Sequence, residues 1–556
     1  MEFGRSVCGD LAAAERREWL VTNGLGGYAC GTIAGSLTRR YHGLLVAATV
    51  PPTGRTLLVA KAEESVEYGG QSFDLSTNHW RSGIVSPTGN IHIERFTLRG
   101  TVAVWQYVFA DALLEKSIWM EHGANTTYVR YAHVRGREPI ELALRILVNY
   151  RDANAVTRGG DWRMDVASVS RGIRVEAFGG ATPFFVCGER DGLAPCHEWY
   201  REFSLPAESD RGLEDVDDHL CAALGRIRLE PGESFAFVAT DNSSEAVDAV
   251  ASLERVERRD SQLIAAWEKA RPEAAGAPAW VRRCVLAADA FIVARTPADD
   301  PAVRSIVAGY PWFGDWARDA MIALPGLTLT TGRPKVAASI LRTFAAFVDG
   351  GMLPNYVPQA GETPHYNAVD APLWFIEAVS AYIDATADLA LLRDLFPVLD
   401  RIVCAYRDGT RYGIALDPSD GLIRAGEAGV QLTWMDAKVG DRVVTPRIGK
   451  PVEIAALWYD ATRRMATLAP LVQQRSEPYA ALADRAAAGF GRFWNAGVEY
   501  CYDVLDGPDG SDATLRPNQL LAVSLPFSPL DAVRQRQVVS ACGGRLFAAT
   551  GLRSLD

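Results

Sequence analysis

Two short segments combine carboxylates with indole rings in surroundings that otherwise have a helical pattern. The first segment, GYPWFGDWARDAMIALPG (309–326), contains Trp312, Asp315, Trp316, Arg318 and Asp319. The second segment, TWMDAKVG (433–440), contains Trp434, Asp436 and Lys438 beside a turn. Aromatic rings stack on the flat C–H faces of sugars, while carboxylates and Arg bind their hydroxyl edges. The two segments therefore indicate a pyranose-binding site.

A pair of carboxyl groups would extend this site from binding to hydrolysis. Cleavage of a glycosidic bond needs one protonated carboxyl to assist the leaving oxygen and one ionised carboxylate to activate water. A structural interpretation stays open for each residue taken singly. A Trp in a helix is more often part of the core, and an Asp beside an Arg is more often a structural ion pair.

Further polar residues lie where loops lead into helices, in positions suited to hydroxyl binding. The candidates are Asn355, Asp370, Lys438, Arg447 and Glu453. Each could instead cap a helix or support another residue. Glu453 follows Pro451, which equally suits an acidic first helical turn. Arg318 can either keep Asp319 ionised or bind hydroxyls through its planar fork.

Composition excludes several other classes of function. The chain of 556 residues has a formal net charge of −11, so phosphate backbones and anionic membrane surfaces are poor partners. It contains neither an apolar stretch of signal-peptide length at its amino terminus nor a membrane-spanning apolar run. The nine cysteines are scattered without a CxxC pair, which favours reduced thiols in a cytoplasmic protein. We expect no metal and no organic cofactor, since a two-carboxylate mechanism needs neither.

The first half of the chain has the pattern of β-structure. Apolar residues alternate with polar ones from Ile140 to Tyr150, as in a half-buried strand. The runs TVAVWQYVF (101–109) and TTYVRYAHV (126–134) are rich in β-branched and aromatic residues. Strands separated by turn residues over residues 1–270 predict a sandwich of two large antiparallel sheets.

A linker and a helical domain are predicted after this sandwich. The Pro/Gly/Ala-rich stretch from 271 to 280 has the composition of a linker. Beyond it, in residues 281–556, apolar residues recur at helical spacing in three segments, near 336–347, 391–406 and 454–465. Helices joined by long aromatic loops favour an α/α toroid, although periodicity alone does not exclude a solenoid.

Seven ordered motifs resemble the bacterial and archaeal glycogen-debranching enzyme family of the amylo-α-1,6-glucosidase type. They are EWLVTNGLGGYACGTIAGSLTRRYHGLLVA (18–47), GYPWFGDWARDAMIALPGL (309–327), GMLPNYVP (351–358), YNAVDAPLWF (366–375), TWMDAKVG (433–440), TPRIGKPVEIAALWY (445–459) and LRPNQLLAVSLP (515–526). Because they are spread over both halves in order, they form a far more specific signal than any one motif alone.

The resemblance implies a β-supersandwich followed by an (α/α)6 barrel related to those of glucoamylases and trehalases. It further implies an inverting hydrolase that releases glucose from α-1,6 branch points of glycogen or branched malto-oligosaccharides. Asp436 corresponds to the general acid. Two roles stay open for Asp319, either the general base or a clamp on the substrate. A base–acid pair is expected to lie about 6.5–9.5 Å apart, with room for water.

The family pattern continues past LRSL (552–555) into a further segment with a late glutamate. We therefore expect the last barrel helices to lie outside this chain, and the late glutamate is the alternative base. Two rival functions stay open. One is another barrel glucosidase or disaccharide phosphorylase, and the other is a catalytically inactive carbohydrate-binding protein.

Overall fold

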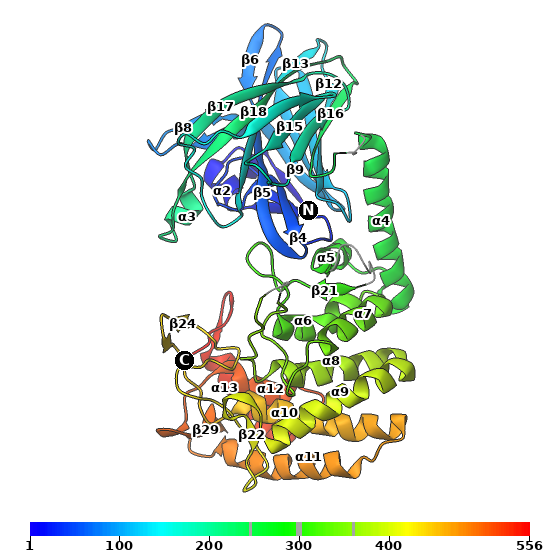
Figure 1. Cartoon of the computed structure of the whole chain (residues 1–556), viewed down its shortest axis with the longest axis vertical. Helices are drawn as coiled ribbons and strands as arrows, with labels where there is room; N and C mark the ends of the chain where they lie inside the picture. The colour runs from blue at the N-terminus through cyan, green and yellow to red at the C-terminus, as the bar shows by residue number, and fades with distance from the viewer. Residues whose placement is uncertain (244–246, 296–302, 359–361) are drawn as a thin grey trace. The chain divides into compact units, whose positions relative to one another are not determined.

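The structure is a computed structural model that describes residues 1–243, 247–295, 303–358 and 362–556. The chain forms two compact units (Figure 1). Unit 1 contains residues Met1–Val303 together with Gly309–Gly314, and unit 2 contains Arg304–Ala308 together with Asp315–Asp556. The first tryptophan-bearing motif is therefore divided, with GYPWFG in unit 1 and DWARD in unit 2.

Unit 1 contains the two large antiparallel sheets expected from the sequence. The nine-stranded sheet has the order β1 (Glu2–Gly4), β9 (Ile93–Arg99), β10 (Val102–Phe109), β11 (Ala112–Met120), β12 (Thr126–Arg135), β19 (Ser234–Thr240), β16 (Phe184–Gly188), β15 (Gly172–Glu176) and β14 (Asp165–Val169). The eight-stranded sheet has the order β17 (Leu193–Ser204), β18 (Val216–Leu229), β13 (Ile140–Asp152), β5 (Thr53–Tyr68), β4 (Gly43–Val50), β3 (Tyr28–Thr32) and β2 (Glu18–Thr22), with β6 (Gln71–Asp74) beside β5.

Alternation along the strands produces the core of unit 1. In β13, the residues Ile140, Leu142, Leu144, Ile146 and Val148 all enter one hydrophobic cluster that draws on both sheets. A second, smaller cluster forms where helix α4 (Ala249–Ala270) packs on the nine-stranded sheet (Figure 1). There the indole N–H of Trp119 donates to the Ser252 hydroxyl at 3.0 Å.

The predicted linker at 271–280 lies inside unit 1. It follows α4 and contains a short 3-10 turn, Pro272–Ala274, before helix α5 (Ala279–Ala290) begins. The Pro and Gly residues thus separate helix α4 from helix α5. The boundary between the two units lies further along the chain than the predicted linker, between Val303 and Arg304. Helices α4 and α5 both belong to unit 1.

Unit 2 is predominantly helical. Its helices are α6 (Ala317–Leu324), α7 (Pro334–Ala345), α8 (Ala371–Thr386), α9 (Leu389–Asp408), α10 (Val452–Leu468), α11 (Glu477–Phe490), α12 (Leu521–Ser524) and α13 (Ala532–Arg545). A π-helical turn, Pro325–Leu329, follows α6. Helix α8 contacts α6, α7, α9 and α10, so apolar residues occupy most of its surface (Figure 1). The three predicted helical segments correspond to α7, α9 and α10.

Long loops between these helices contain short hairpins. Strands β22 (Ala415–Leu416) and β23 (Ile423–Arg424) pair with each other, as do β24 (Lys438–Val439) and β25 (Arg442–Val443). Strands β26 (Lys450–Pro451), β29 (Val504–Gly507) and β30 (Gly510–Asp512) form a three-stranded sheet. Across the described residues, every helix is too short or too polar to cross a membrane.

Candidate active site

The first turn of α6 presents Arg318 and Asp319. Trp316 occupies the N-cap position with an extended backbone, and the N–H of Ala317 donates to the carbonyl of Asn355 at 3.0 Å. Trp316 also forms a β-bridge with Tyr356, and their ring centroids lie 5.9 Å apart. The segment around Asn355 thereby supplies the partner that the free end of the helix needs.

Arg318 connects two other candidate residues. Its Nε donates to Asp370 Oδ2 at 2.6 Å, and its Nη1 lies 3.4 Å from Asp436 Oδ2. Arg318 and Asp370 are buried, whereas 36% of the Asp436 side chain is exposed. Burial alone would lower the pKa of Arg318, but the carboxylates of Asp370 and Asp436 outweigh it and raise that pKa. The guanidinium therefore stays charged and holds both carboxylates.

Asp319 lies at the solvent-exposed edge of the same cluster. Partial desolvation raises its pKa above 3.8, and the charges of Asp370 and Asp436 add to that rise against the opposing effect of Arg318. Asp319 thus holds a proton to higher pH than a free aspartate does. Four of the predicted site residues, Arg318, Asp319, Asp370 and Asp436, belong to one charged cluster.

Several buried polar atoms at this end of the helices lack a hydrogen-bond partner in the part of the chain that the structure describes. They are Arg318 Nη2, Asp370 Oδ1, Asn355 Oδ1 and Asn367 Oδ1. A buried polar atom without a partner costs about 1–3 kcal/mol. Such atoms are suited to a ligand rich in hydroxyl groups, which can both donate and accept.

The second tryptophan-bearing segment forms a loop that the helical core anchors. The N–H of Val369 donates to the carbonyl of Leu432 at 2.9 Å, which places this loop beside the start of α8. Trp434 is 41% exposed, and its indole N–H donates to Asn518 Oδ1 at 2.7 Å. Lys438 lies exposed on β24, where its Nζ donates to the carbonyl of Gly429 at 3.3 Å.

Arg447 and Glu453 are buried together. Arg447 Nη2 donates to Glu453 Oε2 at 2.7 Å, and its Nε donates to Asp503 Oδ2 at 2.8 Å. Burial raises the pKa of Glu453 and Asp503 raises it further, whereas Arg447 opposes the rise. Both residues make their hydrogen bonds within the protein, and Glu453 lies in the first turn of α10 as its sequence position suggested.

Trp312 and Asp315 lie in different units. In unit 1, the Trp312 ring is 48% exposed, perpendicular to Tyr41 at 5.6 Å, with the Arg211 guanidinium 5.5 Å from its centroid. In unit 2, buried Asp315 accepts a hydrogen bond from Ser305 Oγ at 2.9 Å. The eight residues from Trp312 to Asp319 are therefore divided between the two units.

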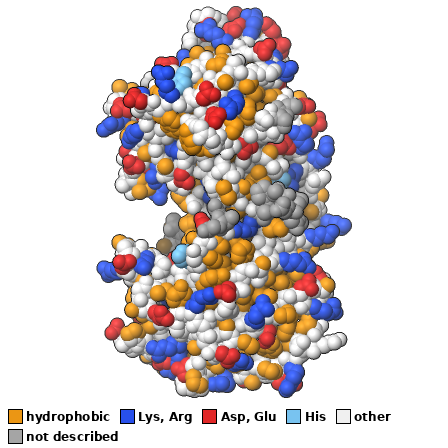
Figure 2. Space-filling view, in the orientation of Figure 1, with side chains coloured by type: hydrophobic (Ala, Val, Ile, Leu, Met, Phe, Trp, Pro, Cys, Tyr) orange, Lys and Arg blue, Asp and Glu red, His pale blue; other side chains and the backbone are white. Residues whose placement is uncertain are grey.

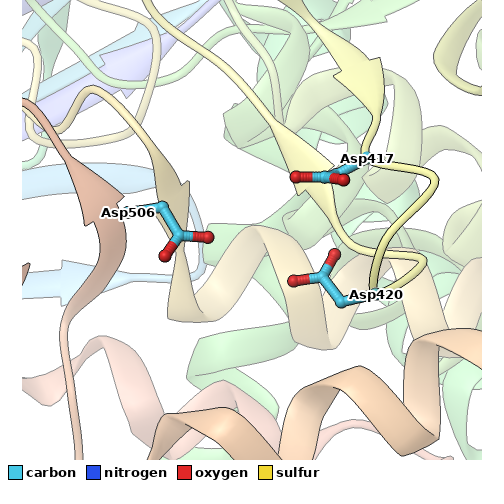
Figure 3. Close-up of side chains that lie close together, drawn as sticks. All are labelled: Asp417, Asp420 and Asp506. Atoms are coloured by element: carbon cyan, nitrogen blue, oxygen red, sulfur yellow. The ribbon is translucent and has the colours of Figure 1, made fainter.

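A separate acidic cluster in unit 2 consists of Asp417, Asp420 and Asp506 (Figure 3). Lys450 Nζ lies 2.8, 2.8 and 2.7 Å from their carboxylate oxygens, and Arg492 contacts Asp420 and Asp506. Hydrogen bonds from Arg492 and Lys450 lower the pKa of Asp506 to about 2. The carboxylates are thus the partners of a buried lysine, whose ammonium a metal ion would have to displace.

On the face seen in Figure 2, acidic and basic side chains are interspersed with hydrophobic ones. In its described residues, this face therefore lacks the continuous basic patch that a polyanion requires.

Two sequence families match the chain. Residues 286–556 match the family described as amylo-alpha-1,6-glucosidase, and residues 17–236 match the glycogen debranching enzyme N terminal family. The glycogen debranching enzyme of Saccharomyces cerevisiae is 40% identical over 91 residues, which are 16% of this chain and 6% of the yeast protein. The chain thus covers only a small part of this relative's length.

Two solved structures are also similar. A bacterial glucoamylase complexed with acarbose has 10% identity and a TM-score of 0.48, over 96% of this chain and 78% of the glucoamylase. The GH78 family rhamnosidase of Bacillus sp. GL1 has 14% identity and a TM-score of 0.38, over 72% of this chain and 40% of the rhamnosidase. Neither TM-score reaches 0.5, so these two similarities establish no shared fold.

Proposed function

Because the chain belongs to the glycogen debranching enzyme family of the amylo-α-1,6-glucosidase type, we propose that it hydrolyses α-1,6-glucosidic bonds. The substrates are glucose stubs at the branch points of glycogen-derived dextrins, and the product is free glucose. The observation that carries the proposal is the charged cluster of Arg318, Asp319, Asp370 and Asp436. It combines carboxylates with buried polar atoms that need hydroxyl partners.

In this proposal Asp436 is the general acid that protonates the leaving glycosidic oxygen. Its side chain is 36% exposed, so a substrate can reach it, and Arg318 fixes one of its oxygens. Asp319 is the general base that removes a proton from the attacking water. The C–O bond to the leaving sugar breaks as the bond to water forms on the opposite face of the ring, which inverts the anomeric centre. Asp319 as a substrate clamp is the alternative.

Hydroxyl recognition falls to the buried atoms around Arg318. Asp370 Oδ1, Asn355 Oδ1 and Asn367 Oδ1 can accept hydrogen bonds from sugar hydroxyls, and Arg318 Nη2 can donate one. In unit 2, Trp316 and Trp434 offer rings for stacking, and in unit 1 Trp312 offers a ring of its own. Lys438 lies at the exposed edge of the site, while buried Asp315 and the Arg447–Glu453 pair support it from within.

The helices of unit 2 belong, in this proposal, to an (α/α)6 barrel whose loops form the site. A cytoplasmic location fits the nine cysteines, since all of them are free thiols.

Product analysis tests the proposal. The full-length protein is incubated with a glucosyl-branched dextrin, with and without inorganic phosphate. We expect free glucose in both cases, and loss of at least about a thousandfold in kcat for Asp436→Asn, because general acid catalysis is worth that order. Asp441→Asn is the matched control, since Asp441 is an exposed carboxylate in the hairpin that follows Asp436. Glucose 1-phosphate as product, or near-normal turnover by Asp436→Asn, would refute the proposal.

A further inference from the structure

We infer that Asn518, held by Asp503, is a positioning residue that fixes the indole ring of Trp434 beside the general acid. The inference rests on the proposed function, because it concerns how the same site binds a glucan. It assigns a role to Asn518 and Asp503, which lie outside both tryptophan-bearing segments.

Asn518 forms a direct bridge between Trp434 and a buried carboxylate. It lies in the 3-10 turn Pro517–Leu520 and is 3% exposed. Its Oδ1 accepts from the Trp434 indole N–H at 2.7 Å, and its Nδ2 donates to Asp503 Oδ1 at 2.7 Å. An indole N–H can only donate and an ionised carboxylate can only accept, so one orientation of the amide satisfies both partners.

Asp503 in turn has little freedom. It is 2% exposed and accepts from Arg447 Nε at 2.8 Å and from Arg447 Nη2 at 2.9 Å. Arg516 Nε lies 3.5 Å from the same carboxylate, and Arg447 also pairs with Glu453 at the start of α10. The bridge from Asn518 therefore ends on a buried ion cluster that is fixed to a helix.

This arrangement matters because Trp434 is 41% exposed. An exposed side chain that must be ordered on binding costs affinity, and a ring that is already oriented avoids that cost. Trp434 precedes Asp436 by two residues, so the same bridge limits the movement of the loop that carries the acid. Asn518 Nδ2 also lies 3.6 Å from the Sδ atom of Met435, the residue between Trp434 and Asp436 in the sequence.

A purely structural role for this cluster makes a different prediction. If Asn518 and Asp503 only stabilised the fold, changing Asn518 would lower stability and leave the Michaelis constant of the folded protein unchanged. If Asn518 positions Trp434, removing either end of their hydrogen bond should weaken glucan binding. Removing both ends should then add nothing further.

A double-mutant cycle separates these roles. Trp434→Phe keeps an aromatic ring and leaves the buried cluster untouched, but it removes the donor. Asn518→Ala removes the acceptor. In the full-length protein we expect each single variant to raise KM for a glucosyl-branched dextrin about fivefold to tenfold, the effect of one hydrogen bond. We expect kcat to change less than KM, and the double variant to resemble the singles.

Trp494→Phe is the matched control, because Trp494 packs against Arg534 elsewhere in the unit. It should leave KM unchanged. The Kd of maltoheptaose, measured by calorimetry on the same variants, provides a readout that does not depend on catalysis. If the wild-type protein releases no glucose, the proposed hydrolase activity fails while the cycle in Kd still tests the positioning role. A wild-type KM and Kd in Trp434→Phe, or additive effects in the double variant, would overturn the inference.

Discussion

At the scale of single residues, Arg318 is the group on which the candidate site depends. It gives a short charge-assisted hydrogen bond to Asp370, at 2.6 Å, and a longer contact to Asp436, at 3.4 Å. The two contacts use different nitrogens of one planar group. A lysine could supply the charge but could not make both contacts in this geometry.

Arg318→Lys should therefore reduce activity more than stability. The charge that compensates buried Asp370 is retained, while the fork that also reaches Asp436 is lost. A charge-assisted hydrogen bond is worth about 1.5–3 kcal/mol, so we expect kcat/KM on a branched dextrin to fall about tenfold to a hundredfold. Arg342→Lys, at an exposed pair with Asp394, is the control and should change neither quantity. A kcat/KM equal to that of the wild type would show that the fork is unnecessary.

The sequence identifies part of this site because some residue types occur in characteristic surroundings. Asp436 and Arg318 stand beside tryptophans in the motifs, so they could be proposed directly. Asn367 and Asn518 were not proposed. Asparagine in a loop before a helix is usually a cap or a turn residue, and only the packing shows which atoms are buried. A signal was present for Asn518, since it is a polar residue followed by the apolar run from Leu520 to Val523.

At the scale of helices, the contact between α8 and α10 contains an unusual carboxyl pair. Asp460 is 1% exposed, and burial together with the charge and hydrogen bonding of Glu377 raises its pKa to about 8. Arg464 pairs with Glu377 at 3.0 Å, and the N–H of Phe527 donates to Asp460 at 3.0 Å. The folded protein thus binds a proton here that the unfolded chain releases near pH 3.8.

This proton makes the stability of unit 2 dependent on pH. Because the folded state holds the proton more tightly, the contribution of Asp460 to stability is greatest below pH 3.8 and is lost as pH rises to about 8. Asp460→Asn keeps both hydrogen bonds without the ionisation. In the wild type, the free energy of unfolding should fall by about 1.4 kcal/mol for each pH unit as pH rises toward 8. In Asp460→Asn this fall should be absent. Urea unfolding followed by circular dichroism of the helices measures both. Asp484→Asn, at an exposed position on α11, should leave the slope unchanged. An unchanged pH dependence of stability in Asp460→Asn would contradict the binding of a proton by Asp460 in the folded state.

The hairpins around Lys450 give a second prediction at this scale. The Lys450 side chain is 1% exposed and compensates three carboxylates, two from the loop between β22 and β23 and one from β29. Removing one partner of a buried ion network costs about 3–5 kcal/mol. Lys450→Met should therefore lower the free energy of unfolding by that amount, whereas Lys335→Met, on an exposed face of α7, should lower it by less than about 0.5 kcal/mol. Partial recovery on adding calcium would fit the cluster of three carboxylates, and undiminished stability would contradict the role of Lys450.

Elements with a clear period were predictable, and irregular ones were not. The apolar stripes of α7, α9 and α10 and the alternation in β13 follow from burial on one face. The two-residue strands at 438–439, 442–443 and 450–451 are too short to show a periodic pattern in the sequence. Their register depends on contacts such as Lys450 with Asp506, which are distant in the sequence.

At the scale of the whole molecule, the division between units cuts through the first tryptophan-bearing motif. Residues Gly309–Gly314 belong to unit 1, where Tyr310 packs against Tyr28 and the Arg55 guanidinium lies 4.9 Å from the Tyr310 ring centroid. In the sequence, residues 309–326 are contiguous and therefore look like a single motif. The contacts that divide it come from residues more than two hundred positions earlier in the chain.

Trp312 gives unit 1 an exposed aromatic ring on which a glucan can stack. Its ring is held by Tyr41 and Arg211 and remains 48% exposed. Loss of an aromatic stacking partner costs about 1 kcal/mol or more, so Trp312→Ala should weaken maltoheptaose binding about tenfold in calorimetry. Trp280→Ala is the control, since Trp280 is 68% exposed on α5 of the same unit. Equal affinities for both variants and the wild type would exclude Trp312 from the binding surface.

The anomeric form of the first glucose released tests the proposed inverting mechanism most directly. The full-length protein is mixed with a glucosyl-branched dextrin, and the product is followed by proton nuclear magnetic resonance before mutarotation equilibrates the anomers. An inverting two-carboxylate mechanism at an α-1,6 bond predicts that β-glucose appears first. Initial release of α-glucose would contradict the assignment of Asp436 and Asp319 as acid and base, and release of no glucose would contradict the proposed activity itself.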